Sequence, residues 1–420
     1  MEEAHLILFL DGRSGEYLSY RDVKLEVAGE RVSFCPICRP ESPLAAVRAV
    51  VTAMVLGQEL VLLDPGQTED EVLASGLSLQ EVNRAKELKG VNLPEDPLKW
   101  WDLVFPAHAF KLTLFTSGSS GRSKKASHSL EVLARMVRRS RAHRASVWGM
   151  GYHATHIAGI QVLLQALANG NPLISLHGMN AESFLSLVSR QKVTHLAGSP
   201  SFFRQIPKGS WISETVRSVT LGAEPARSED FARLSELFPG AHLRNAYAST
   251  EAGTLLIGEG ELFSIPLESK GLISIHDEQI YVAASTWGNN PDIKKEDRWI
   301  STGDRIAWEK NKPGWFRILG REGDSISTGG WQVNPYEVEA VLRELPGIED
   351  CRVYGRANSL LGNVVAADIV CKATPVEIKD AEIRRYLAER LQDYKLPRFI
   401  RRVEEIPRTR TGKIRRLSHE

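Results

Sequence analysis

Cysteine is scarce in this chain of 420 residues, which contains only four. So few cysteines exclude a disulfide-stapled secreted domain, because such domains pair several cysteines within a short chain. Long apolar runs are absent as well, and none approaches the roughly 20 residues of a membrane-spanning helix. The opening residues MEEAHLILFLDG have an acidic start and a short apolar core, unlike a secretory signal. We therefore expect a cytoplasmic protein without a membrane span.

Charge of one sign is not in excess either. Lys and Arg together number 53 and Asp and Glu 52, so the formal net charge is +1. A chain without a strong overall field has no electrostatic preference for nucleic acid or for an acidic membrane surface. We therefore expect small molecules, rather than nucleic acid or membrane, as the main partners.

Cys35 and Cys38 form a lone C-x-x-C pair. Such a pair is found in half of some zinc sites and in redox sites, but no second C-x-x-C and no nearby Cys/His pair completes four ligands. We favour the simpler interpretation, in which two thiols lie at the end of a strand.

The order of predicted elements indicates an α/β fold. A strand is predicted over residues 31–38, an amphipathic helix over 43–56 and a buried strand over 60–63. Between 90 and 110, prolines and tryptophans break any period, so this segment is predicted to be irregular. Further strands are predicted near 112–115, 172–176, 194–197 and 217–221, and a β-rich unit over 262–320. This alternation favours an α/β sheet.

The chain is too long for one ordinary core, so we expect two domains. Gly320 and Gly323 flank charged residues at the end of the β-rich part, which predicts a boundary there. After it, α+β structure is predicted, with helices over 335–344 and 377–392 and strands over 350–354 and 364–371. The expected division is a large N-terminal domain over 1–319, a hinge over 320–324 and a small mobile C-terminal domain over 325–420.

A loop rich in Ser and Gly follows the strand at 112–115. Glycines let successive backbone N–H groups converge, hydroxyls add donors and lysines add positive charge, a combination that suits a polyphosphate. The pattern G-x-x-x-x-G-K-[ST] is absent here, and an ordinary surface loop is the alternative. The phosphate-binding candidates are Thr116, Ser117, Gly118, Ser119, Ser120, Gly121 and Lys124.

Five further motifs follow this loop in a fixed order. They are Gly222-Ala223-Glu224-Pro225, Tyr247-Ala248-Ser249-Thr250-Glu251, Ser301-Thr302-Gly303-Asp304 with Gly320-Arg321, Gly329-Gly330-Trp331, and Thr411-Gly412-Lys413. The ordered series resembles the adenylate-forming superfamily of acyl-CoA synthetases, peptide-synthetase adenylation domains and luciferases. The resemblance runs from about residue 30 to residue 416. It implies an enzyme that uses ATP to activate a carboxylic acid as an acyl-adenylate and then transfers the acyl group to a thiol.

The resemblance assigns nucleotide-binding roles to several residues. The loop at 116–125 would hold the β- and γ-phosphates, Gly222, Ala223 and Glu224 would line the adenine pocket, and Tyr247 would stack on adenine. Asp304 would accept hydrogen bonds from both ribose hydroxyls, and Arg321 would support the ribose and the phosphate.

The same resemblance assigns the catalytic and metal roles. Thr250 would donate to the α-phosphate and Glu251 would hold Mg²⁺, a hard cation that carboxylate oxygens suit. Lys413, on the C-terminal domain, would meet the carboxylate and the α-phosphate and stabilise charge as pyrophosphate leaves. ATP would then lie between the two domains. Gly323 stands where relatives usually have a hinge Asp or Lys, which leaves the end states of the hinge motion less sharply defined.

His153 and His156 lie three residues apart, a spacing that also occurs in metal sites. His156-Ile-Ala-Gly159, however, matches the H-x-x-G segment of the family. The match implies a role for His156 beside the acyl pocket rather than as a metal ligand. Ile160 and Leu163 would form an apolar pocket wall, and Ser199 would add a polar group.

The compact N-terminal part looks most like the short o-succinylbenzoate–CoA ligases of menaquinone synthesis. Coenzyme A is the expected acceptor because no carrier domain follows, and Gly329-Gly330-Trp331 resembles the thiol side of CoA ligases. Two alternatives stay open: an enzyme that loads an acid onto a carrier-protein thiol, and a degenerate nucleotide-binding protein without catalysis. Retention of Asp304, Glu251 and Lys413 argues against degeneracy, and both a monomer and a homodimer agree with the sequence.

Overall fold

The structure is a computed structural model that describes residues 7–104, 109–117, 123–207, 213–287, 298–321, 324–328, 331–358, 362–371, 378–408 and 414. The chain forms two compact units. The larger is made of Met1–Ser274 and Val282–Ile300, and the smaller of Ile275–Tyr281 and Ser301–Glu420. The predicted hinge at 320–324 stays a prediction, since Gly323 lies outside the described residues.

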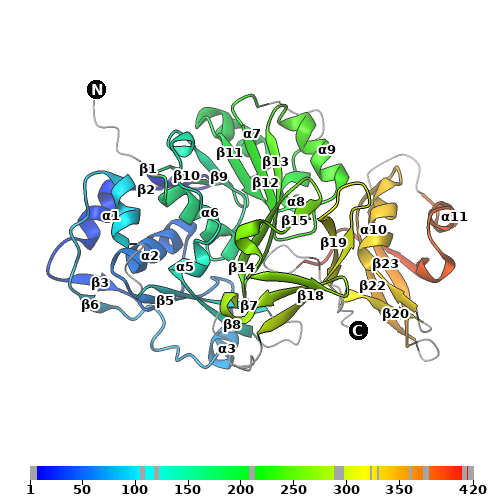
Figure 1. Cartoon of the computed structure of the whole chain (residues 1–420), viewed down its shortest axis with the longest axis horizontal. Coiled ribbons are helices and arrows are strands. Elements are labelled where there is room, and N and C mark those ends of the chain that lie inside the picture. Colours follow the sequence, from blue (N-terminus) through cyan, green and yellow to red (C-terminus); the bar gives the residue numbers. More distant parts are fainter. Residues whose placement is uncertain are drawn as a thin grey trace. The chain divides into compact units, whose positions relative to one another are not determined.

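The elements follow one another in the order that Figure 1 colours along the chain. The strands up to residue 283 are β1 (Ile7–Asp11), β2 (Tyr17–Ser19), β3 (Val32–Phe34), β4 (Ile37–Cys38), β5 (Glu59–Leu62), β6 (Lys86–Leu88), β7 (Lys111–Ser117), β8 (Ser123–Ser129), β9 (Trp148–Met150), β10 (Leu173–Ser175), β11 (His195–Gly198), β12 (Ser218–Gly222), β13 (His242–Ser249), β14 (Gly253–Glu259), β15 (Leu262–Ser264), β16 (Ile273–His276) and β17 (Gln279–Ala283). The α-helices among them are α1 (Tyr20–Val27), α2 (Pro43–Val55), α3 (Glu69–Ala74), α4 (Trp100–Val104), α5 (Leu130–Leu133), α6 (Ile157–Leu167), α7 (Ala181–Arg190), α8 (Pro200–Arg204) and α9 (Ser228–Leu237).

The main sheet of the larger unit is parallel at its centre. Six parallel strands lie in the order β13-β12-β11-β9-β10-β1, and β14 and β2 pair antiparallel at its two sides. The chain passes from β9 through α6 to β10 and then returns through α7 to β11, on the other side of β9. Because parallel crossovers are right-handed, this reversal of direction puts α6 on one face and α7, α8 and α9 on the other. The predicted α/β class is confirmed.

Two hydrophobic cores lie on the two faces of this sheet. Alternating strand residues divide between them, since Leu173 belongs to the core of α6 and its neighbour Ile174 to the core of α7 and α9. Phe9 and Leu10 divide in the same way. This is the pattern of a strand buried on both faces, where side chains alternate at a period of two.

A second, smaller sheet contains β4, β5, β7 and β8. β4, β5 and β7 are parallel, and β8 returns antiparallel to β7 as a hairpin. Helix α2 begins with Ser42 as N-cap, whose hydroxyl accepts the backbone N–H of Ala45 at 3.1 Å, and with Pro43 in its first turn. A separate ribbon pairs β3 with β6.

The smaller unit is an α+β structure. Its elements after residue 298 are β18 (Trp299–Trp308), β19 (Trp315–Arg321), β20 (Ile326–Thr328), β21 (Trp331–Val333), α10 (Pro335–Glu344), β22 (Ile348–Asn358), β23 (Gly362–Cys371), α11 (Asp380–Ala388) and β24 (Phe399–Arg402). Strand β23 pairs antiparallel with β22, and also with β20 and, in parallel, with β24. The buried Asp368 on β23 binds Arg352 at 2.7 Å and Arg401 at 2.9 Å, so its charge is compensated.

Some predicted elements differ in their bounds. The single strand predicted over 31–38 is divided into β3 and β4, because Pro36 between them has no N–H for a ladder. The segment predicted as irregular over 90–110 contains α4, which buries Trp100 and Trp101. Helix α11 ends at Ala388, earlier than predicted.

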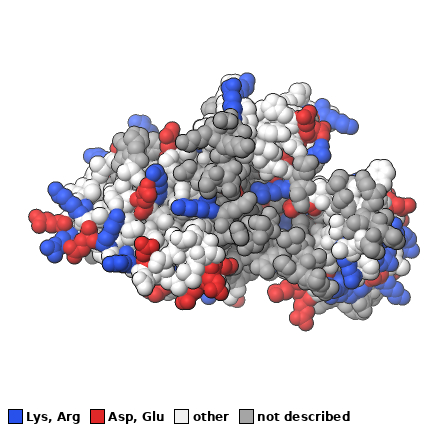
Figure 2. All heavy atoms as spheres, turned by 90° about the horizontal axis from the view of Figure 1, so that it is seen from below, with Lys and Arg blue, Asp and Glu red and all other residues white. Residues whose placement is uncertain are grey.

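No described helix combines the length and apolar character needed to cross a bilayer. Lys and Arg side chains lie among Asp and Glu side chains on the face drawn in Figure 2. This mixture agrees with the formal net charge of +1.

Candidate functional site

Several polar residues of the larger unit follow the carboxyl ends of its parallel strands, and Ser199, Glu224 and Thr250 among them are predicted site residues. His153 follows β9, His177 follows β10, Ser199 follows β11, Glu224 follows β12 and Thr250 follows β13. Carboxyl ends of parallel strands meet at one edge of a sheet, and ligands bind there where the strand order reverses. The reversal beside β9 therefore marks this edge as the candidate active site.

The predicted phosphate loop joins the two strands of the β7–β8 hairpin. Thr116 pairs in register with Lys124, and Ser117 with Ser123. Residues 118–122, with Gly118, Ser119, Ser120 and Gly121, lie outside the described residues. The described residues on either side of this segment belong to an antiparallel pair of strands, and β7 is also parallel to β5.

His128 of β8 holds the turn that contains Thr250 and Glu251. Its Nε2 donates to the carbonyl oxygen of Thr250 at 2.6 Å, which fixes the tautomer because a carbonyl only accepts. Burial lowers the pKa of His128, while this hydrogen bond and the charge of Glu251 act in the opposite direction. The phosphate-loop hairpin and the turn predicted to bind Mg²⁺ are therefore joined by a neutral buried imidazole.

Helix α6 supports the same turn from another side. The hydroxyl of Thr254, at the start of β14, donates to Oε1 of Gln161 on α6 at 2.6 Å. Glu251 is half-buried between these contacts. Its carboxylate is on a turn held by two neighbouring elements, which suits a fixed cation ligand.

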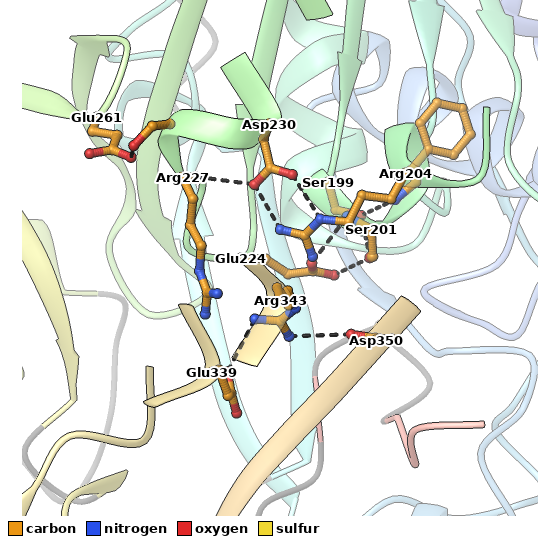
Figure 3. A network of polar contacts seen from close by, with 12 residues as sticks. Ser199, Ser201, Arg204, Glu224, Arg227, Asp230, Glu261, Glu339, Arg343 and Asp350 are labelled. Atoms are coloured by element: carbon orange, nitrogen blue, oxygen red, sulfur yellow. Dashed lines mark hydrogen bonds and ion pairs between the residues drawn. The ribbon is translucent and has the colours of Figure 1, made fainter. Parts of the chain in front are cut away.

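The predicted adenine segment has a constrained backbone. Ala223 has φ of +67°, in the left-handed region that residues with a Cβ rarely adopt. Glu224 accepts hydrogen bonds from the backbone N–H and the hydroxyl of Ser201 (Figure 3). Nearby, Arg204 and Asp230 form a two-pronged ion pair with both N···O distances 2.7 Å. Strain of this kind accumulates at binding sites, where surrounding contacts maintain it.

Tyr247 is half-buried on β13, and its ring centroid lies 6.4 Å from that of Phe263. The register between β13 and β14 shifts directly after Tyr247. Gly222 pairs in register with Ala246, so the adenine segment and Tyr247 lie on adjacent strands. The structure thus brings Gly222, Ala223, Glu224 and Tyr247 to neighbouring positions.

His156 is the N-cap of α6 and lies at the same edge. Gly159 is required there, since a Cβ would lie 2.4 Å from the carbonyl oxygen of His153. Nε2 of His156 lies 3.3 Å from Oδ2 of Asp64, which follows β5. Ile160 and Leu163, the predicted pocket wall, are core residues.

Burial lowers the pKa of His153 to about 4, and the neighbouring His156 and His177 act in the same direction. Burial alone raises the pKa of the Asp64 carboxyl. Hydrogen bonds from His156 and from the N–H of Gly66, together with nearby positive charge, outweigh that effect and lower this pKa to about 2. Asp64 is therefore ionised and His153 neutral at pH 7.

Cys35 and Cys38 are free thiols. Burial raises the pKa of Cys38 to about 11, and Cys35 acts in the same direction. A thiol with such a pKa is a poor nucleophile and a poor metal ligand at pH 7. The simpler interpretation of this pair stays a prediction.

In the smaller unit, Asp304 and Arg321 are register partners on β18 and β19. Nε of Arg321 lies 3.4 Å from Oδ1 of Asp304, which is largely buried. Two residues predicted to act on the ribose thus lie side by side. Gly329, Gly330 and Lys413 lie outside the described residues.

Trp331 begins β21 and stacks on Tyr394, with ring centroids 4.7 Å apart and planes at 19°. Its side chain is 59% exposed despite this contact. Arg408 and Ile414, the described residues on either side of the segment 409–413, form an antiparallel bridge, and Arg408 binds Asp350 at 2.7 Å.

A cavity of about 470 Å³ lies against β5, β7 and β8. Lys111, Lys125, His128 and Trp287 are among its lining residues, whereas Glu224 and Tyr247 are not. It therefore does not coincide with the predicted adenine segment.

The sequence did not identify Asp64, Ser201 or His177 as site residues. Asp64 directly follows a short buried strand, and His177 follows another. Residues that follow parallel strands are candidates for the carboxyl edge, so this position was the available indication.

Comparison with known proteins places the chain in a family. Residues 44–271 match the family described as AMP-binding enzyme, and residues 337–413 match the AMP-binding enzyme C-terminal domain. The chain belongs to the AMP-binding enzyme family, so the resemblance found in the sequence is confirmed.

Its relatives are acid–CoA ligases by name. The chain is 27% identical to the long-chain-fatty-acid–CoA ligase FadD13 of Mycobacterium tuberculosis over 339 residues, which are 72% of this chain and 65% of that protein. It is 25% identical to the 2-succinylbenzoate–CoA ligase of Listeria monocytogenes over 344 residues, with 76% and 70% covered. The matched part thus spans a little under two thirds of the length of FadD13.

Solved structures share the fold. The o-succinylbenzoate CoA synthetase (MenE) from Bacillus subtilis, in complex with the acyl-adenylate OSB-AMP, matches with a TM-score of 0.74 at 18% identity, over 98% of this chain and 95% of that one. ATP-bound MatB from Rhodopseudomonas palustris has a TM-score of 0.74 at 19% identity, with 99% and 95% covered.

Proposed function

We propose that this protein is an AMP-forming carboxylic acid–CoA ligase that uses ATP. In the first step the carboxylate of the acid attacks the α-phosphorus of ATP, which gives an acyl-adenylate and releases pyrophosphate. In the second step the thiol of coenzyme A attacks the acyl carbonyl, which gives a thioester and releases AMP. Membership of the AMP-binding enzyme family supports this chemistry.

The observation that carries the proposal is the contact between His128 and Thr250. It joins the strand after the phosphate loop to the turn with Thr250 and Glu251. A loop for the β- and γ-phosphates and a turn for the α-phosphate and Mg²⁺ must lie close together on one nucleotide. In this proposal Thr250 donates to the α-phosphate and Glu251 holds the magnesium ion.

The remaining roles follow from the same chemistry. Tyr247 stacks on adenine beside Glu224, and Asp304 accepts hydrogen bonds from the ribose hydroxyls. Arg321 keeps the Asp304 carboxylate oriented. Lys413 contributes positive charge to the carboxylate and α-phosphate as pyrophosphate leaves, an electrostatic role that depends on where charge develops.

We propose 2-succinylbenzoate as the acid. Relatives divide between long-chain fatty acids and 2-succinylbenzoate, so their names alone favour neither acid. Ser199 and His156 support the second, because they are polar groups at the carboxyl edge able to orient a second functional group. Placed polar groups discriminate strongly against a substrate that lacks the matching group.

The test is a comparison of kcat/KM for 2-succinylbenzoate, benzoate, octanoate and palmitate with coenzyme A present. We expect 2-succinylbenzoate to be preferred by at least about tenfold, a difference of about 1.4 kcal/mol in transition-state binding. A tenfold preference for octanoate or palmitate would overturn the substrate and leave adenylation intact. Pyrophosphate release without any CoA thioester would favour a carrier-protein thiol as the acceptor.

A further inference from the structure

Asp64, His153 and His156 form a cluster at the carboxyl edge of the larger unit. Asp64 follows β5, whereas His153 and His156 both lie in the short segment between β9 and α6, where His156 is the N-cap of the helix. Each offers one ligand atom, and these three atoms all lie within 4.8 Å of one another. All three side chains are half-buried, so the cluster is partly accessible to solvent.

The distances suit a small cation. Two ligands bound tetrahedrally at about 2.0–2.1 Å from one ion lie about 3.3 Å apart. The separation between Nε2 of His156 and Oδ2 of Asp64 is 3.3 Å. These two atoms therefore need almost no movement, and the ligand atom of His153 lies within 4.8 Å of both.

The outer contacts orient the ligands. Nδ1 of His153 lies 2.7 Å from the hydroxyl oxygen of Thr155 and accepts the backbone N–H of Thr155 at 3.4 Å. Nδ1 is therefore engaged within the chain, and Nε2 is the nitrogen left for an ion, which would displace its proton. Oδ1 of Asp64 accepts the N–H of Gly66 at 2.8 Å, which leaves Oδ2 as the oxygen that can bind an ion. Partners of this kind fix the tautomer of a histidine ligand and the direction of a carboxylate.

His177 extends the cluster. Its Nδ1 donates to the carbonyl oxygen of Gly151 at 3.3 Å, so its Nε2 carries a lone pair. Its ring meets that of His153 edge to face, with centroids 5.3 Å apart. A third imidazole is thus next to this cluster. It follows β10, which pairs with β9 on the side away from β11.

We propose that Asp64, His153 and His156 bind one divalent transition-metal ion, with Zn²⁺ as the best fit. Imidazole nitrogens with one carboxylate suit zinc and its first-row neighbours, whereas Mg²⁺ prefers oxygen ligands throughout. The site differs from the magnesium site proposed at Glu251. Three protein ligands leave one position open, as in zinc sites that bind a water or an anionic oxygen. The side chains of His156 and Asp64 are 20% and 24% exposed, so the ion has an access path.

The test uses the full-length protein after dialysis against a chelator, and no ATP. Titration calorimetry with ZnCl₂ at pH 7.5 is expected to give one equivalent per chain. Asp64→Asn and His153→Gln are each expected to weaken binding by at least about 10–100-fold, the range that even outer-shell partners reach. Excess Mg²⁺ is expected not to compete.

The matched control is His195→Gln. His195 packs against His143 in the same unit, with ring centroids 5.6 Å apart. The substitution therefore changes a histidine pair outside the proposed zinc site. Zinc binding by this variant is expected to equal that of the wild type. Far-UV circular dichroism checks that each variant is folded, and the absorption of bound Co²⁺ reports coordination in the wild type and in His156→Gln.

Two results would overturn the proposal: no stoichiometric zinc binding by the folded wild type, or equal binding by Asp64→Asn, His153→Gln and His195→Gln. Because binding is measured without nucleotide or acid, these results are independent of whether the protein is a ligase.

Discussion

The imidazole Nε2 of His128 lies 2.6 Å from the carbonyl oxygen of Thr250, a residue 122 positions further along the chain. This contact joins the smaller sheet to the end of a central strand of the larger one. It also places a neutral donor, fixed by burial, directly behind the turn proposed to bind the α-phosphate and magnesium. His128 is therefore a positioning residue.

We expect His128→Leu to lower kcat/KM for pyrophosphate formation by about 10–100-fold, because misplacing a binding group by about 1 Å costs as much. His128→Gln keeps an N–H donor near the position of Nε2 and is expected to restore most of the rate. If His128 only stabilised the fold, both variants would have a lower free energy of unfolding. The molecules that remain folded would then have the wild-type KM for ATP. Steady-state kinetics together with urea unfolding separates the two cases.

Asp304 and Arg321 give a second prediction. Asp304→Asn keeps the size of the side chain but removes its charge, and charge-assisted hydrogen bonds contribute about 1.5–3 kcal/mol. We expect the Kd for ATP to rise about 10–100-fold. The control is Arg317→Gln, which breaks the 2.7 Å pair between Arg317 on β19 and Glu309, the residue that directly follows β18. An equal loss of ATP binding in Arg317→Gln would contradict the ribose role of Asp304.

Lys413→Ala is expected to slow adenylation by about two to three orders of magnitude, the usual cost of removing one donor to a developing charge. Thioester formation from preformed acyl-adenylate is expected to be nearly unchanged, because pyrophosphate has already left. Single-turnover measurements of each half-reaction make the comparison. Equal losses in both half-reactions would contradict the role proposed for Lys413.

The pH dependence of stability follows from His153 and His195. Burial, with neighbouring positive groups, lowers the pKa of each to about 4, below the value of about 6.5 in an unfolded chain. Between pH 6.5 and 4 the unfolded state therefore binds protons that the folded state does not, and the free energy of unfolding falls as the pH falls. Each histidine contributes a slope of up to about 1.4 kcal/mol per pH unit.

Urea unfolding at pH 7, 5.5 and 4.5 measures this slope. His195→Gln is expected to reduce it, whatever the variant does to stability at pH 7. An unchanged slope in His195→Gln would mean that this histidine does not titrate as its buried position implies.

The sequence predicted the fold class and the order of the elements well, because apolar periods and glycine-rich turns are local features. Helix α10 has the predicted bounds, since Asn334 caps it and Pro335 starts it. Asp64 could not be found in the same way. Its meeting with His156 depends on two strands from different sheets ending close together, and no local pattern records such a meeting.

His128 shows the same limit at the candidate site. Its partner is a backbone carbonyl, which any residue supplies, so no sequence pattern indicates this contact. The motif residues themselves were found through the family resemblance, and their individual roles remain predictions.

The central claim is that the protein forms an acyl-adenylate, and the most direct test is pyrophosphate release with purified protein, ATP, Mg²⁺ and a panel of carboxylic acids, with and without coenzyme A. We expect acid-dependent release of pyrophosphate, formation of AMP, and a CoA thioester of the preferred acid. Tight binding of ATP without pyrophosphate release for any acid, under conditions where the protein is folded, would contradict it and indicate a nucleotide-binding protein without ligase activity.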